Sequence, residues 1–169
     1  MKKIPVILMF PLLLTSCSAA YIKPNANLSQ YEYAAFGEPE TSLERPYIPY
    51  VASVLKKYGF KITEETGKAN SLLCRLSITP LSTYGYKAEI SLWNKKEKVL
   101  SVESKNQGFA TLKEDGKNQA IRDLVFKVAM DFDGHLQVHM EGKQKRNPPH
   151  TVMTFEEFFI RMERGEFKK

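Results

Sequence analysis

Apolar and polar residues alternate most clearly in the middle of the chain. Over residues 72–79 and 84–93 every second side chain is largely apolar, and residues 98–104 resume the pattern after a short polar connection. Such alternation is typical of strands with one buried and one wet face, and connections this short predict an antiparallel meander. We also predict a tyrosine-containing strand over residues 28–36 and the start of another at 60–63.

Two segments repeat apolar residues at three- and four-residue steps, which predicts amphipathic helices. The first ends at Tyr58, with Gly59 as its C-cap, and the second ends near Phe132, with Gly134 as its stop. Together these elements predict an α+β domain over residues 28–141. We expect an antiparallel sheet of about four to five strands with two helices packed on one face.

A short third helix is predicted at the end of the chain, over residues 154–169. A basic, proline-containing linker over residues 142–153 precedes it, and Thr154 and Glu157 have capping-box spacing. The apolar face of this helix is formed by Phe155, Phe158, Phe159 and Met162. A helix of about ten residues is marginal in water unless this face is buried. We therefore expect the tail to dock, and we treat its face as a candidate partner-binding surface.

The beginning of the chain has the features of a secretory signal, predicted over residues 1–16. Two lysines precede an apolar run that ends at Leu14, and Pro5 and Pro11 interrupt the run. The run is too short to span a bilayer, which needs about 20 apolar residues. This segment therefore predicts export.

The last residues of this segment resemble the lipobox of bacterial lipoproteins. Leu14, Thr15, Ser16 and Cys17 supply an aliphatic residue, two small residues and a cysteine in the required order. The resemblance implies cleavage before Cys17 and a covalent lipid on its thiol. It also implies the outer membrane, on the periplasmic side, because Ser18 rather than aspartate follows. Ordinary cleavage that leaves a soluble secreted protein is the alternative.

Residues 17–27 are short and mostly polar, and Pro24 disfavours helix, so we predict a lipidated tether. Without the signal, 23 basic residues face 19 acidic ones, an excess of four that is spread along the chain. Such a balance favours a domain held near anionic lipid over a nucleic-acid binder. With Cys17 lipidated, Cys74 has no partner for an intrachain disulfide.

The order of elements is similar to that of a broad group of small α+β domains in bacterial envelope lipoproteins. The similarity rests on the helix that ends in Leu55, Lys56, Lys57, Tyr58, Gly59 and Phe60, followed by a polar loop and an apolar strand. It covers residues 28–132 as an arrangement of elements and contains no invariant motif. The resemblance therefore carries over no catalytic residue.

Candidate metal ligands cluster only near the end of the second predicted helix. His135 and His139 are four residues apart, a spacing that can hold a metal on one helix face with Asp131 or Asp133. Residues 135–140 alternate more like a strand, however, which would separate the two histidines by about 13 Å. We favour a solvated helix end, and we predict no cofactor beyond the lipid.

Cys74 lies on the apolar face of its predicted strand, so we expect it to be packed in the core rather than reactive. No hydrolase elbow, phosphate-binding loop or paired-cysteine motif occurs. We therefore expect a non-enzymatic, outer-membrane lipoprotein that binds another envelope protein. The alternative is a small-ligand carrier or sensor with a tyrosine-lined groove between helix and sheet. An enzyme would require Asp133 and both histidines to converge on a pocket.

Overall fold

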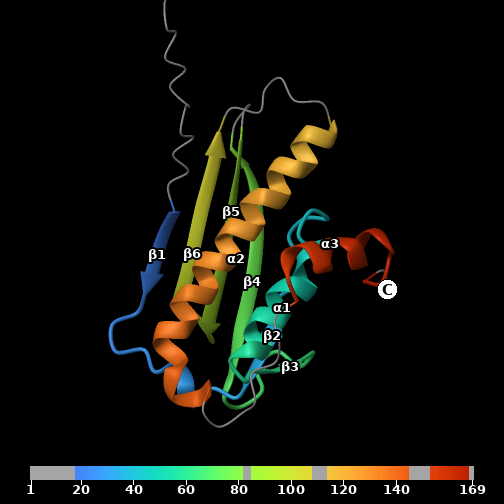
Figure 1. Cartoon of the computed structure of the whole chain (residues 1–169). Coiled ribbons are helices and arrows are strands. Elements are labelled where there is room, and N and C mark those ends of the chain that lie inside the picture. Colours follow the sequence, from blue (N-terminus) through green and yellow to red (C-terminus); the bar gives the residue numbers. More distant parts are fainter. Residues whose placement is uncertain (1–17, 82–84, 108–113, 145–152, 168–169) are drawn as a thin grey trace, which may run out of the picture.

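The computed structural model describes residues 18–81, 85–107, 114–144 and 153–167, and these form a mixed α+β structure. One six-stranded sheet has the strand order β1-β6-β5-β4-β2-β3, and the helices α1 and α2 cover one of its faces (Figure 1). The strands are β1 (Ser18–Ile22), β2 (Tyr33–Phe36), β3 (Lys61–Thr63), β4 (Ser71–Leu81), β5 (Gly85–Asn94) and β6 (Glu97–Gln107). The helices are α1 (Ile48–Lys57), α2 (Glu114–Gln144) and α3 (Phe155–Glu163), with short 3-10 helices η1 (Leu28–Gln30) and η2 (Arg45–Tyr47).

The predicted meander is confirmed for β4, β5 and β6, which pair antiparallel in sequence order. Their alternation sorts the side chains as expected, so that Cys74, Ile90 and Val102 are buried against the helices. The opposite face, called the open face below, carries the polar members of the same strands, such as Arg75 and Glu89. The pattern of one buried and one wet face therefore follows directly from the sequence.

The prediction of an antiparallel sheet with four to five strands was wrong, because the sheet has six strands and is mixed. β2 runs parallel to both β3 and β4. The helix α1 lies between β2 and β3 in the chain, and such a crossover brings the second strand back in the same direction. The predicted strand over 28–36 is also shorter. Its first part is η1, and Asn27 Oδ1 accepts a hydrogen bond from the Ser29 N–H at 3.1 Å.

The predicted tether over residues 17–27 is also corrected, because Ser18 is already part of the sheet. β1 pairs with β6 over its whole length, from Ser18 opposite Ser104 to Ile22 opposite Leu100. Ile22 packs against the hydrophobic core, and the Lys23 N–H donates to the Val99 carbonyl at 2.9 Å. Backbone pairing thus orders a segment whose composition suggests a flexible linker.

The helix α2 continues ten residues beyond its predicted stop at Gly134 and includes the residues for which a strand was considered. Leu136 and Met140 extend the buried stripe, and both are fully buried. Gly134 is exposed on the outer side, where it costs about 1 kcal/mol relative to alanine. The burial of two large side chains outweighs that cost. Residues 142–144 of the predicted linker are therefore helical, and most of the rest lies outside the described residues.

Two other predicted helix boundaries, the stop at Gly59 and the cap at Thr154, are confirmed, whereas α3 ends at Glu163 and is shorter than the predicted 154–169. Gly59 follows α1 with φ at 81°, a conformation that suits glycine, and the Thr154 Oγ1 caps α3 by accepting from the Glu157 N–H at 3.1 Å. In the described parts of the chain, we find no helix with the length and apolar character needed to cross a membrane.

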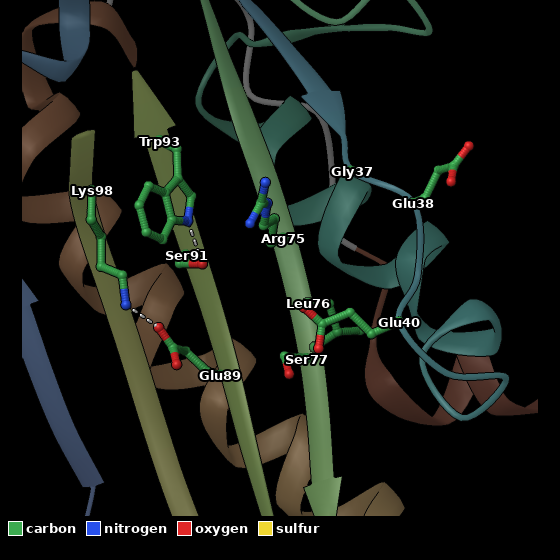
Figure 2. A pocket seen from close by; sticks show the side chains of 10 residues that line it. All are labelled: Gly37, Glu38, Glu40, Arg75, Leu76, Ser77, Glu89, Ser91, Trp93 and Lys98. Carbon is green, nitrogen blue, oxygen red and sulfur yellow. Dashed lines mark hydrogen bonds and ion pairs between the residues drawn. The ribbon is translucent and has the colours of Figure 1, made fainter. Parts of the chain in front are cut away.

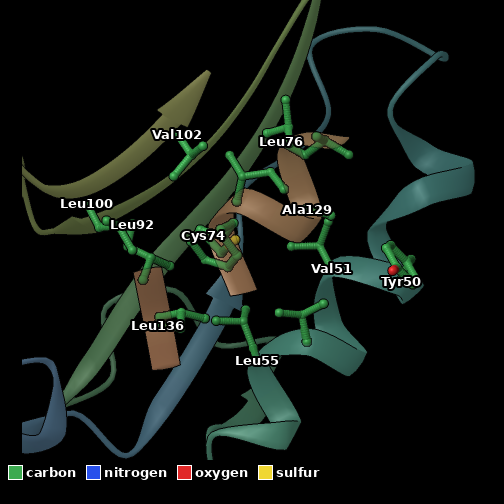
Figure 3. Close-up of a cluster of buried hydrophobic side chains, with 14 of the residues drawn as sticks. Tyr50, Val51, Leu55, Cys74, Leu76, Leu92, Leu100, Val102, Ala129 and Leu136 are labelled. Carbon is green, nitrogen blue, oxygen red and sulfur yellow. The ribbon is translucent and has the colours of Figure 1, made fainter. Parts of the chain in front are cut away.

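One cluster of buried side chains joins the helices to the sheet (Figure 3). Leu55 of α1, Leu136 of α2 and Leu92 of β5 are all fully buried within it. The cluster occupies the space between helix and sheet, where the ligand-carrier hypothesis requires a cavity. It also includes three of the tyrosines that the hypothesis would place in a groove, namely Tyr31, Tyr47 and Tyr50.

Candidate functional site

A hollow of about 390 Å³ lies on the open face of the sheet (Figure 2). β4 and β5 form its floor, Lys98 of β6 borders it on one side, and Gly37, Glu38 and Glu40 border it on the other. At its centre are five side chains that we call the Trp93 cluster: Arg75, Glu89, Ser91, Trp93 and Lys98. These residues come from three adjacent strands, so the sheet register sets their spacing.

Trp93, the only tryptophan in the sequence, lies between two cations. The Arg75 guanidinium is 5.5 Å from the centre of the indole ring, and the Lys98 ammonium is 5.2 Å from it. The indole N–H donates a hydrogen bond to the Ser91 hydroxyl at 2.9 Å. A shift in register at Leu92 and Trp93 marks a bulge, a feature that commonly re-aims a side chain. The indole is thus half-buried and held in a fixed orientation.

The two cations of the cluster differ in their partners. Lys98 forms an ion pair with Glu89 at 2.6 Å. Among the described residues, no carboxylate lies within ion-pair distance of Arg75, so its N–H donors remain available. A Cβ at Gly37 would lie 3.3 Å from the Arg75 Cγ, so glycine leaves room for the arginine stem. Arg75 therefore offers an accessible guanidinium beside an aromatic ring.

A line of ion pairs continues from the Trp93 cluster along the open face. Lys87 lies 3.6 Å from the Glu89 carboxylate and 3.5 Å from that of Glu103, which in turn lies 3.4 Å from Lys105. Partial burial raises the pKa of the Glu103 carboxyl, but the two nearby ammonium groups outweigh this effect and hold the pKa below its ordinary value. Glu103 therefore stays ionised, and the face presents fixed charges of both signs.

The arrangement around Trp93 is suited to binding. Tryptophan and arginine are the residues most enriched where protein partners make their strongest contacts. The cluster shows no arrangement for nucleophilic catalysis, since the Ser91 hydroxyl accepts the indole N–H and no histidine is among the residues that line the hollow. The alternation over residues 72–79 and 84–93 puts Arg75 and Trp93 on the wet face, but it does not predict the cluster, because the pairing of strands is not visible in local alternation.

The predicted partner surface on the last helix is largely internal. Phe158 is 0% exposed, and its ring lies 5.3 Å from that of Tyr50 in α1 and 5.2 Å from that of Phe167. Phe159 is half-buried and packs its ring 4.1 Å from the Arg122 guanidinium of α2. The structure therefore corrects the prediction for Phe158, which belongs to the core of its own chain. Met162 is also partly buried against this core, and the side chain of Phe155 lies outside the described residues.

The two candidate metal ligands, His135 and His139, lie one helical turn apart on α2, not in a strand. Asp133 does not join them, because its carboxylate is held by the Lys57 ammonium at 2.7 Å and the Tyr58 hydroxyl at 2.7 Å. Within the described residues, no group of three or more His, Cys, Asp or Glu side chains is placed to hold a metal ion. Asp133 instead ties α2 to α1.

Burial raises the pKa of the Tyr58 hydroxyl, and the hydrogen bond to the Asp133 carboxylate raises it further. The pKa of the Cys74 thiol is also raised, in this case by burial alone. Cys74 is 0% exposed, which confirms the prediction that it is a core residue. Neither group is thus prepared for nucleophilic chemistry at neutral pH.

A second, more open hollow of about 520 Å³ lies between β1 and α2. His135 and Asp131 line it together with Ala20, Met130 and Val138. One carboxylate oxygen of Asp131 is buried and has no hydrogen-bond partner among the described residues. Two ligand-type side chains alone do not complete a metal site, which takes three or four protein ligands.

No protein-family model and no curated protein matches this chain. Among solved structures, two crystal forms of the PelC dodecamer from Paraburkholderia phytofirmans show a distant likeness. One is a point variant at 11% sequence identity and the other has 10% identity, and both have a TM-score of 0.38. Each match covers 65% of this chain and 94% of the PelC chain.

Proposed function

We propose that this protein is a non-enzymatic lipoprotein, anchored by a lipid on Cys17 to the periplasmic side of the outer membrane, and that its Trp93 cluster binds another cell-envelope protein. The observation that carries the binding role is the half-buried indole between Arg75 and Lys98 on the open face. The lipobox that ends in Cys17 and the export signal before it support the anchor.

A protein partner fits the chemistry of the cluster. The indole offers a rigid apolar surface whose ordering costs little entropy, and Arg75 offers several donors in a planar fork. Fixed charges of both signs surround them, which favours a partner with a matching charge pattern. The filled space between helix and sheet counts against the small-ligand carrier.

The absence of catalysis is part of the proposal and rests on the chemistry of the open face. A nucleophilic mechanism needs a hydroxyl or thiol within reach of a base. The hydroxyl beside Trp93 is engaged with the indole, and Cys74 is buried on the opposite side of the sheet. A binding role accounts for these features of the cluster without a catalytic step.

The experiment compares two alanine variants, Trp93→Ala and Arg75→Ala, with a matched surface control, Val138→Ala. Val138 is 70% exposed and lies on α2, away from the open face. The tagged, lipidated protein would be cross-linked in cells and purified from solubilised envelopes. We expect one protein to be recovered in constant ratio with the parent and the control and to be reduced at least tenfold with both cluster variants, which corresponds to about 1.4 kcal/mol.

The folding of each variant must be checked, so that loss of the partner is not mistaken for the effect of an unfolded domain. Because Trp93 and Arg75 lie outside the main core, we expect urea midpoints close to that of the parent. Recovery of the same partner in undiminished ratio with both variants would show that the Trp93 cluster is not the binding surface.

A further inference from the structure

The first strand of the sheet begins one residue after the proposed anchor. Ser18 is the first residue of β1, and it is already paired with Ser104 of β6. Successive Cα atoms are 3.8 Å apart, so a lipid on Cys17 is joined to the sheet by a single peptide unit. No tether separates the bilayer from the domain, and the end of the sheet at Ser18 must stay close to the lipid headgroups.

The register shows which parts of the domain share that end. Ser104 lies opposite Ala88 of β5, and Ala88 lies opposite Ile78 of β4. The end of the sheet near Ser18 therefore holds the last residues of β4 and β6, the first residues of β5 and the start of α2 (Figure 1). We call this the anchor end. The turn between β5 and β6, at Lys95 and Lys96, lies at the opposite end.

Two lysines lie near the anchor end on the open face. Lys105 follows Ser104 directly and is 48% exposed, and Lys87 lies opposite it in β5. Both lysines lie within ion-pair distance of Glu103, and Lys87 also lies within ion-pair distance of Glu89, so two ammonium groups face two carboxylates here. Lysines near a bilayer are attracted to the phosphates of anionic lipids.

We propose that the domain stands directly on the bilayer with its anchor end against the phospholipid headgroups and its strands rising away from the surface. This inference rests on lipidation of Cys17, which is part of the proposed function. Trp93 lies eight residues along β5 from Gly85, which places it about 27 Å farther from the headgroups than the first residue of that strand. The Trp93 cluster is thus held away from the membrane, where a partner in the periplasm can reach it.

The test attaches a fluorophore at one of two exposed lysines, using the variants Lys105→Cys and Lys96→Cys of the full-length, lipidated protein. Cys74 is fully buried and needs no replacement. The labelled proteins are reconstituted in vesicles of phosphatidylethanolamine and phosphatidylglycerol that include a lipid with a nitroxide on its headgroup. We expect the label at position 105 to be quenched several-fold more strongly than the label at position 96. Equal quenching, or stronger quenching at position 96, overturns the proposed orientation.

A variant with a flexible glycine-serine segment inserted between Cys17 and Ser18 is the matched control. It keeps the lipid and the domain but lengthens the connection between them. We therefore expect the difference in quenching between the labels at positions 105 and 96 to fall toward zero. Retention of the full difference would overturn the proposal that the short connection sets the orientation. Flotation of the protein with the vesicles distinguishes a wrong orientation from a missing lipid anchor. Protein that floats but shows equal quenching contradicts the orientation alone, and protein that does not float contradicts the anchor as well.

Discussion

The Glu44 carboxylate lies fully inside the protein and accepts a hydrogen bond from the backbone N–H of Ile78 at 3.1 Å. Its second oxygen accepts from the N–H of Thr41, also at 3.1 Å. β2 pairs with β4 only as far as Cys74, so beyond that residue no strand of the described residues pairs with β4 on this side. Glu44 therefore supplies an acceptor that a longer β2 would otherwise provide.

Replacement of this carboxylate tests its role at the strand. Glu44→Ala leaves two N–H groups without acceptors, and we expect it to lower the free energy of unfolding by about 2 kcal/mol. Glu44→Gln keeps one amide oxygen as an acceptor, so we expect a smaller loss. Urea denaturation measures both. An alanine variant as stable as the parent would show that water satisfies these groups equally well.

Phe158 provides a second test, because the structure makes it a core residue. We expect Phe158→Ala to destabilise the domain by about 3–5 kcal/mol, the usual cost of truncating a buried phenylalanine. Ile160 lies on the same helix and is half-exposed, so Ile160→Ala is the matched control, with an expected change within about 0.5 kcal/mol. Equal stability of the two variants in urea would mean that α3 is not docked as described.

Because of the Tyr58 hydroxyl, we expect the free energy of unfolding to depend on pH in the alkaline range. Its pKa is raised in the folded state above the value of about 10 in the unfolded chain, so its contribution to stability is complete below pH 10 and declines as the pH rises further. Tyr58→Phe lacks this group. We expect the variant to be less stable at pH 7 by about 1–2 kcal/mol and to lose less stability than the parent between neutral and strongly alkaline pH.

Urea unfolding at a series of pH values measures this difference. Tyr21→Phe serves as the control, because Tyr21 lies on β1 and its side chain is half-exposed. We expect its stability curve to run parallel to that of the parent. The same parallel course for Tyr58→Phe would contradict the link between Tyr58 and Asp133.

Gly134 predicts a gain in stability. It lies inside α2 on the exposed side, and a Cβ added there would have no neighbour within 4 Å. We expect Gly134→Ala to raise the free energy of unfolding by about 0.5–1 kcal/mol, because alanine favours the helix and restricts the unfolded chain. Gly59→Ala should have the opposite effect, since its φ of 81° is unfavourable for alanine. Thermal unfolding measures the change in stability of both variants. A loss of stability with Gly134→Ala would contradict a continuous helix at this position.

Local patterns predicted those parts of the fold that depend on local physics. The alternation in β4, β5 and β6, the cap at Thr154 and the stop at Gly59 all arise from neighbours in sequence. The parallel pairing of β2 was missed because it depends on the path of the chain around α1. The full length of α2 was missed because Gly134 is a strong stop signal that only the burial of Leu136 and Met140 overrides.

The candidate site was less accessible to sequence reasoning. Arg75 and Lys98 are separated from Trp93 by 18 and 5 positions, and only the register of three strands brings them together. The aromatic side chains of the last helix gave a stronger local signal, yet an amphipathic face alone does not indicate whether its partner is the same chain or another one. Phe158 shows that here the partner is the same chain.

Mass spectrometry of the mature amino terminus tests the central claim most directly. The protein would be expressed with its own signal in a bacterium that processes lipoproteins, and its first peptide would be compared with that of the Cys17→Ser variant. We expect the parent to begin at Cys17 with the added mass of a diacylglyceryl group and acyl chain, and the variant to lack this mass and to leave the membrane fraction. An identical, unlipidated product from both proteins would contradict the anchor on which the proposed function and the orientation on the bilayer depend.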